Sequence, residues 1–282
     1  MTSRISSLFV VGALALALPG CAMWSGGSRQ HQSSSVVQFL YPDKDQPFIV
    51  PSIPTLRLPL RVGVAFVPPG QHGYQSSSSF PEARKSELLR QIAGEFKALP
   101  FVQSIEVIPT TYLRPGGGFE NLDQLRALMG IDVAVLIAYD QAQVTNDTAW
   151  TFAYWTIIGA YVVPAQKNDT HTLTEAVVYD IASRKLLFRA PGVSAIKGHA
   201  TAVRNDEEML ADSARGFNEA ALDLTTNLKS ELELFKTRIK EAPDEVRIEH
   251  KPGYSGAGSL QGWFATGALA LLAGRFLRRS RR

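Results

Sequence analysis

A single long pattern of apolar residues constrains the fold of this chain more than any other feature. Between residues 206 and 241, apolar side chains recur every three or four positions, the spacing of one face of an α-helix. Such a helix would extend about 54 Å and exceed a small sheet. Its first half should cover a sheet. Its second half either packs in the same fold, the usual fate of an amphipathic face, or projects and contacts a partner. The apolar positions are Leu210, Ala214, Phe217, Ala221, Leu224, Leu228, Leu232, Phe235 and Ile239.

The segments before this helix alternate between strand and helix patterns. Short β-branched runs indicate strands, and apolar residues at helical spacing indicate helices. The nearly continuous apolar run at 131–139 indicates a strand buried on both faces. The order predicts one α/β domain over residues 60–241, a two-layer sandwich of βαβαβ followed by a β-meander and a long closing helix. The predicted strands are 60–67, 102–108, 131–139, 172–181 and 185–190, and the predicted helices are 81–99, 120–129 and 206–241.

The most aromatic stretch of the chain, residues 149–163, allows two interpretations. It can form a hairpin with 172–181 whose aromatic side chains pack under a helix, or a membrane-inserting element of an oligomeric pore. Trp155 and the pair Ile157 and Ile158 interrupt the alternation typical of a membrane strand. Strand edges also cannot be left exposed in lipid. The sequence therefore favours a core hairpin over a pore.

The search for a catalytic or metal-binding motif gives no candidate. The five histidines lie far apart, with no spacing suited to zinc, and His31 falls in a Gly/Ser/Gln-rich segment where we expect it to be solvated. The triple glycine that ends at Gly118 lacks the Lys-Ser/Thr of a phosphate-binding loop, so a plain turn is expected. Asp140 has no acid or histidine near it in sequence and should cap a strand end. We predict no enzymatic activity, no catalytic residue, no metal and no cofactor.

The N-terminus has the layout of an export signal. Arg4 precedes an apolar run at 8–18 that is too short to span a membrane and typical of a signal peptide. Leu18, Gly20 and Cys21 then occupy positions that resemble those of a bacterial lipobox. The resemblance implies cleavage between Gly20 and Cys21, removal of residues 1–20, and attachment of a diacylglycerol lipid to Cys21. Because Cys21 is the only cysteine, no disulfide can form.

Residues 21–59 are rich in glycine and serine and then in proline, which predicts an extended, flexible tether after the lipidated cysteine. The residue after Cys21 is Ala22, and not the Asp that typically retains lipoproteins in the inner membrane. The lipobox resemblance therefore implies a lipid anchor in the outer membrane, with the domain facing the periplasm or the cell surface.

The C-terminus places small residues, an apolar segment and five arginines in that order. Residues 242–259 would form a stalk. Residues 260–282 would form a membrane helix, because its apolar part is about 27 Å long and just reaches across a bilayer core, with the arginines on the cytoplasmic side. A plain single-span anchor is one interpretation. The order also resembles the GlyGly-CTERM sorting signals, which implies cleavage by a rhomboid-family protease (a rhombosortase). The expected cleavage lies within Gly256, Ala257, Gly258 and Ser259.

A lipobox and a sorting tail on one chain are similar to the rhombotarget lipoprotein family. This resemblance implies a non-enzymatic cell-envelope lipoprotein with a transient inner-membrane anchor, whose partners are membrane lipid, the lipoprotein maturation and sorting machinery, and a rhomboid-family protease. The order of strands and helices is also similar to periplasmic lipoprotein domains of the LpoB and CsgG type. Two alternatives are a module that regulates cell-wall synthesis or secretion through the helix at 206–241, and an oligomeric export pore subunit.

The charge distribution agrees with this division of the chain. The whole sequence has 29 basic and 26 acidic residues, a net charge of +3. Arg4 and the five C-terminal arginines lie in terminal segments that contain no acid, and without them the net charge is −3. The basic character therefore belongs to the terminal segments, and nucleic-acid binding is not expected.

Overall fold

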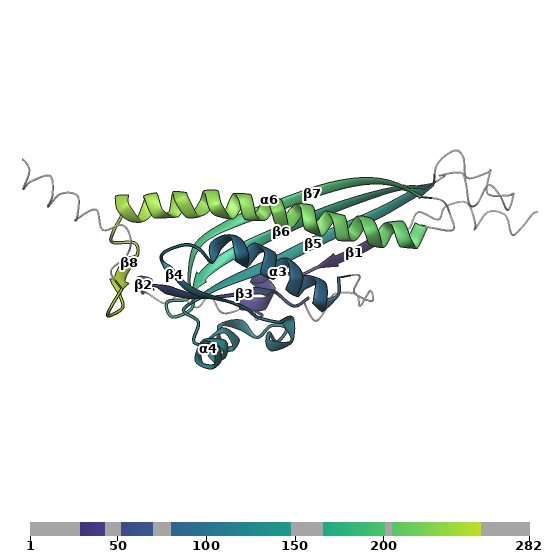
Figure 1. Ribbon diagram of the computed structural model, residues 1–282. Helices are drawn as coiled ribbons and strands as arrows, with labels where there is room; N and C mark the ends of the chain where they lie inside the picture. The colour runs from purple at the N-terminus through teal and green to yellow at the C-terminus, as the bar shows by residue number, and fades with distance from the viewer. Residues whose placement is uncertain (1–28, 43–51, 70–79, 148–165, 201–204, 255–282) are drawn as a thin grey trace, which may run out of the picture.

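The computed structural model describes residues 29–42, 52–69, 80–147, 166–200 and 205–254. These residues form an elongated mixed α/β domain, in which helix α6 (Asn205–Glu241) runs along a central sheet (Figure 1). The mixed α/β class predicted from the sequence is confirmed. The other helices are α2 (Val36–Leu40), α3 (Glu82–Phe96), α4 (Gly118–Met129) and the 3-10 helix η2 (Thr110–Tyr112), and the strands are β1 (Arg29–Ser33), β2 (Thr55–Leu58), β3 (Leu60–Phe66), β4 (Val102–Val107), β5 (Val133–Asp147), β6 (Gln166–Asp180), β7 (Lys185–Ala200) and β8 (Arg247–His250).

The central sheet joins a short parallel region to a long antiparallel one. Its order is β4-β3-β5-β6-β7, with β3 parallel to β4 and β5, and with β5, β6 and β7 antiparallel. Strand β1 pairs with β5 at residues 140–144, just beyond the part of β5 that pairs with β3. We define the parallel end as β3, β4, residues 133–137 of β5, residues 176–180 and 185–190 of β6 and β7 beside them, and the separate β2–β8 pair. The rest of β5, β6 and β7 forms the antiparallel arm.

Helices cover both faces of the sheet at the parallel end. One apolar cluster lies under α3 and α6, and a second lies under α2 and α4 on the opposite face. Alternate residues of one strand enter the two clusters: Val133 and Ile137 face α6, whereas Ala134 and Leu136 face α4. The predicted two-layer sandwich is therefore wrong here, because this part of the domain has three layers.

Four aromatic rings join the residue before the N-cap of α3, helix α6 and the sheet where the parallel end meets the antiparallel arm. Phe80 stacks on Phe217 with ring centroids 3.8 Å apart, and Tyr139 and Phe66 contact this pair edge to face. Such pairs add to the stability gained from burying the rings. This cluster fixes the middle of α6 on the sheet.

The first half of α6 covers the antiparallel arm through polar contacts. Gln141 donates to the backbone oxygen of Ser213 at 3.1 Å, and Gln143 donates to that of Met209 at 2.8 Å. Both glutamine side chains are buried and also bond to threonines of β6. The expectation that the first half of α6 covers a sheet is confirmed. Leu210, however, is 57% exposed and Met209 takes the buried position in its place.

The same helix also protects the edge strand β7. Asp223 accepts from the backbone N–H of Val193 at 2.9 Å, and Asn227 donates to the backbone oxygen of Pro191 at 2.9 Å. An uncovered edge of this length would be a template for pairing with another chain. Side chains of α6 bond to these two backbone groups, so the helix covers this part of the edge.

Two of the predicted strands differ from the structure in extent or partner. The strand expected at 131–139 continues to Asp147, and the strand expected to end at residue 190 continues through Pro191 to Ala200. Strand β6 pairs with Val133–Asp147 of β5 and not with residues 149–163. The aromatic stretch and its two interpretations lie outside the described residues.

Segments expected to link the domain to the membrane contribute to the fold. Part of the predicted tether forms β1 and α2, and part of the predicted stalk forms β8, which pairs with β2 in parallel. The expectation of flexible coil is therefore wrong for Arg29–Ser33. Among the described residues, no helix is long and apolar enough to cross a membrane; residues 1–28 and 255–282 lie outside them.

Candidate functional site

An apolar cavity of about 550 Å³ lies at the parallel end, between the sheet, α3 and the second half of α6. Its floor is formed by side chains of β3, β4 and β5, and the pair of β2 and β8 contributes residues at one side. Ala93 of α3 and Leu232 of α6 line the opposite wall. The second half of α6 therefore packs against its own domain, and Phe235, only 6% exposed, also lines the cavity.

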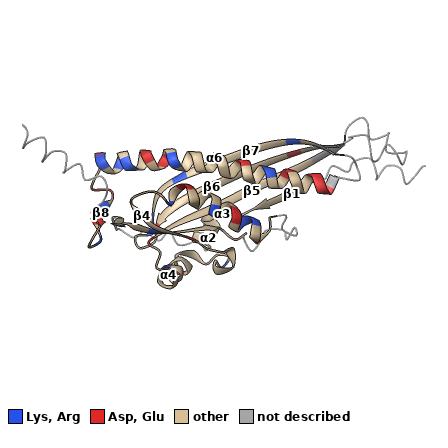
Figure 2. Ribbon diagram, in the orientation of Figure 1, with Lys and Arg blue, Asp and Glu red and all other residues tan. Residues whose placement is uncertain are grey.

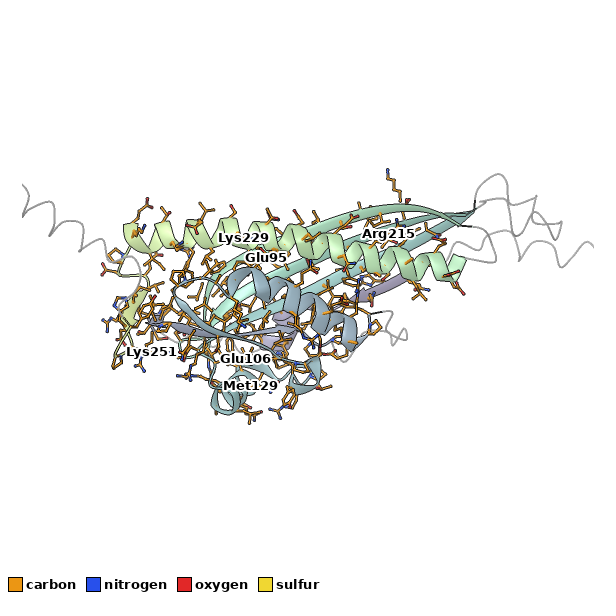
Figure 3. The ribbon with its side chains drawn as sticks, viewed as in Figure 1. Glu95, Glu106, Met129, Arg215, Lys229 and Lys251 are labelled. Atoms are coloured by element: carbon orange, nitrogen blue, oxygen red, sulfur yellow. The ribbon has the colours of Figure 1, made fainter. Side chains whose placement is uncertain are left out.

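An ion pair joins the two helices next to the cavity. The ammonium of Lys229 on α6 donates to the carboxylate of Glu95 on α3 at 2.7 Å (Figure 3). The hydrogen bond from Lys229 lowers the pKa of the Glu95 carboxyl. Both side chains are about half exposed, so the pair contributes little to stability. Its position nevertheless shows that α3 and α6 approach each other on the solvent side of the cavity.

The polar residues that line the cavity come from the end of α6 and from the segment after it. They are Lys236, Lys240, His250 and Tyr254. The Tyr254 hydroxyl donates to the backbone oxygen of Pro100 at 3.0 Å, and its ring lies 5.7 Å from that of His250. Lys236 bonds to Glu233 at 2.7 Å and stands 5.8 Å from the Phe101 ring centroid. We call these four residues the polar mouth.

A network of two cations and one carboxylate holds β8 to the sheet beside the cavity. Asp132 accepts from Arg61 at 3.1 Å and from Lys251 at 3.1 Å, and Lys251 also donates to the backbone oxygen of Pro59 at 2.9 Å. Burial alone would raise the pKa of Asp132, but the hydrogen bonds from Arg61 and Lys251 outweigh it and lower that pKa. All three groups are satisfied by each other, so the network is structural.

The buried lysine of α3 is likewise explained by its neighbours. The Lys85 ammonium lies 5.7 Å from the ring centroids of both Phe80 and Tyr139, and 3.7 Å from the Glu82 carboxylate. Burial lowers the pKa of Lys85. Attraction of the ammonium to two aromatic rings and one carboxylate offsets part of the free-energy cost of burying its charge.

Two residues that the sequence analysis treated independently, His31 and Asp140, form a direct contact in the structure. His31 of β1 and Asp140 of β5 are directly bonded, with 2.8 Å between imidazole Nε2 and carboxylate Oδ1. Asp140 therefore does not cap a strand end, because β5 continues beyond it, and His31 is not in a free linker. Both side chains are more than half exposed. The pairing was missed because the two residues are far apart in sequence and β1 has no apolar pattern.

The other residues singled out from the sequence are the triple glycine and the processing residues at the two termini. The triple glycine forms a turn in which the Asn121 side chain accepts from the backbone N–H of Arg114 at 2.8 Å, and this supports the plain turn. No group of three metal-binding side chains occurs within the described ranges. The lipidation residue, the adjoining signal cleavage position and the C-terminal processing residues lie outside these ranges. They are Gly20, Cys21, Gly256, Ala257, Gly258 and Ser259.

Comparisons with known proteins leave the family open. No family model and no curated protein matches this chain. Among solved structures, a neuraminyllactose-binding hemagglutinin homologue from Helicobacter pylori is similar over 68% of this chain and 96% of its own, with 9% identity and a TM-score of 0.39. Two PelC dodecamers from Paraburkholderia phytofirmans each cover 71% of this chain and 96% of their own, with 9% and 10% identity and TM-scores of 0.29 and 0.27. Similarities this low carry no argument about function.

Proposed function

We propose that this protein is a non-enzymatic lipoprotein of the bacterial cell envelope whose domain binds an apolar ligand. The cavity at the parallel end is the observation that supports this function. The cavity is partly open to solvent and is lined mainly by hydrocarbon. Its volume of about 550 Å³ lies within the range of small-molecule sites.

The walls of the cavity favour a ligand without polar groups along its length. Val62 and Val135 on the floor and Leu228 on α6 each present only hydrocarbon. Polar lining groups are confined to the polar mouth. A ligand that fills this space gains dispersion contacts that the empty walls lack and removes apolar surface from water.

The proposed anchoring rests on the two ends of the chain. The lipobox-like sequence supports a lipid on Cys21, and the small residues before the C-terminal apolar segment support processing within Gly256, Ala257, Gly258 and Ser259. Strands β1 and β8 lie toward opposite ends of the elongated domain (Figure 1). A lipid-anchored N-terminus would therefore hold the cavity at the far end of the domain from the anchor.

The mass of the intact protein, purified from its native envelope, tests the anchoring. A chain that begins at a diacylated Cys21 and ends within residues 256–259 is the expected result. A mass that includes Arg282 would exclude C-terminal cleavage and leave a plain anchor. An unmodified N-terminus would remove the lipoprotein assignment altogether.

Ligand binding is tested with the full chain in lipid nanodiscs and a photoreactive long-chain alkyl probe. We expect the probe to label residues 228–239 of α6, and we expect Ala93→Trp, which places an indole in the cavity, to reduce this labelling at least tenfold. The matched control is Ala127→Trp, on the exposed face of α4. Equal labelling of the two variants would reject the cavity as the binding site.

A further inference from the structure

We infer that the ligand is a single acyl chain that ends in an anionic group, and that Lys240 binds this group at the polar mouth. This inference rests on the proposed function, because it assigns the chemical class of the ligand to the same cavity. The acyl chain would lie along the apolar walls, with its charged end at the C-terminal end of α6.

The first argument is the separation of apolar and polar lining groups. The cavity is lined by hydrocarbon from seven strands and two helices, whereas its polar side chains belong only to the end of α6, to β8 and to Tyr254. A ligand that matches this lining has one long apolar part and one polar end. A molecule that is polar at both ends would leave one polar group against hydrocarbon without a hydrogen-bond partner, which is unfavourable.

The second argument is the sign of the charge at the mouth. Two of the four polar side chains are lysines, the other two are a histidine and a tyrosine, and no carboxylate of the described residues lines the cavity. Lysine has three N–H donors and no acceptor. The mouth therefore complements an anion and repels an alkylammonium group.

Lys240 is the lysine that an anion can engage. Lys236, one helical turn earlier on the same face, is already bonded to both carboxylate oxygens of Glu233 at 2.7 and 3.0 Å. Lys240 is exposed and makes no hydrogen bond or ion pair with any of the described residues. Lys240 both lines the cavity and is exposed to solvent. A long basic side chain at an apolar surface usually covers that surface with its stem and keeps its charge in water.

A purely structural role for these lysines is the competing explanation. Basic residues in the last turn of a helix stabilise the negative end of its dipole, and Arg238 and Lys240 both occupy that turn. Figure 2 shows basic residues at the end of α6 and acidic residues before them. The dipole accounts for the presence of cations at this end, but it does not require that one of them line an apolar cavity.

The test compares three competitors of one chain length that differ only in the end group: a carboxylic acid, a primary alcohol and a primary amine. Each displaces the photoreactive alkyl probe from the full-length protein in nanodiscs of neutral lipid. We expect the acid to displace the probe at a concentration about fivefold lower than the alcohol, the size of effect that an exposed ion pair gives. The amine should be the weakest competitor.

Charge reversal assigns the effect to one residue. Lys240→Glu should abolish the preference for the acid and make the amine the better competitor, while the alcohol is unaffected. Lys197→Glu, the same change on an exposed residue of the antiparallel arm, is the matched control and should leave the order of the three unchanged.

The outcomes separate this inference from the proposed function. Equal displacement by acid and alcohol would overturn the anionic end group and leave apolar ligand binding intact. An acid preference that survives Lys240→Glu would overturn the role of Lys240. If no competitor displaces the probe and the probe does not label α6, the proposed function itself fails, and this inference fails with it.

Discussion

Helix α6 is held to the sheet by different chemistry in its two halves, and the difference explains where a cavity can form. Over the antiparallel arm, the contacts are hydrogen bonds from buried Gln141 and Gln143 and close approaches at glycines. Over the parallel end, the contacts are mainly apolar, such as the Phe188 and Phe235 rings at 5.2 Å, and are supplemented by a hydrogen bond from Arg238 to the backbone oxygen of Leu187. Hydrogen bonds fix distance and angle, so the arm leaves no freedom in the spacing of helix and sheet. Apolar contacts are not directional, and they tolerate the space that forms the cavity.

The largest effect is expected where the helix backbone lies closest to the arm. A Cβ added at Gly192 would lie 2.3 Å from the backbone oxygen of Ala220, so Gly192→Ala forces the helix away from β7. We expect a loss of about 3 kcal/mol in the free energy of unfolding, measured by chemical denaturation. Gly94→Ala is the control, because its Cβ meets nothing within 4 Å, and it should stabilise α3 by about 0.5–1 kcal/mol. Equal effects of the two changes would contradict close packing at the arm.

A somewhat smaller effect is expected from the buried polar contacts of the arm. Gln141→Leu removes a hydrogen-bond partner from three groups. They are the hydroxyl of Ser213, the backbone oxygen of Ser213 and the hydroxyl of Thr172. Buried polar groups that lose their partners cost about 1–3 kcal/mol. Gln103→Leu on the exposed side of β4 should change stability by less than about 0.5 kcal/mol. If Gln141→Leu were stabilising, the arm would be held by apolar packing like the other end.

The network that holds β8 beside the cavity predicts a pH dependence. The pKa of Asp132 is lower in the folded protein than in the unfolded chain, so the folded state binds fewer protons. The stability that the ionised Asp132 carboxyl contributes is fully present above the pKa of the unfolded chain, about 3.9. This contribution is lost as the pH falls through the lower pKa of the folded protein. Asp132→Asn should remove this dependence. Denaturation midpoints of both proteins between pH 2 and 6 would show it, and parallel curves would contradict it.

The smallest effect is expected from filling part of the cavity. Val62→Ile adds one methylene to the cavity wall and should stabilise the domain by about 0.5–1 kcal/mol. The same change at Val177, which is buried in the cluster under α4, should instead cost about 1 kcal/mol because a methylene added to a packed core forces its neighbours to move. Thermal denaturation of the two variants compares the faces directly. Destabilisation by both would mean that the cavity walls are as tightly packed as the opposite face.

Local sequence patterns predicted the apolar parts of this fold and missed the polar ones. The buried strand at 131–139, helices α3 and α4 and the long helix follow from apolar spacing that burial in the core preserves. Strand β1, with the sequence RQHQS, has no such spacing, because pairing with β5 alone makes it a strand. The outer half of β5 was missed for a related reason, since its buried side chains are glutamines satisfied by α6.

The candidate site was less accessible to prediction than the fold. Ala93, Leu232 and Phe235 each have the spacing of ordinary core positions, and nothing in the sequence indicates that space remains between them. The cavity depends on how α3, α6 and the parallel pair β2–β8 are placed relative to one another, and β2 and β8 lie about 190 residues apart. Its polar mouth also includes Tyr254, which was assigned to a stalk.

The pairing of β1 with β5 determines how the domain would respond to a pulling force. Arg29 pairs with Val144 and Ser33 with Asp140, so the chain enters the domain at the outer end of the arm and runs inward, antiparallel to β5. A load applied between residue 29 and residue 254 acts along these strands. The hydrogen bonds of this pair then resist the load together in shear and do not open one after another. Tension from the N-terminal side would therefore be carried by the sheet, whereas at the opposite end the same load would act first on β8 and Tyr254, which line the apolar cavity.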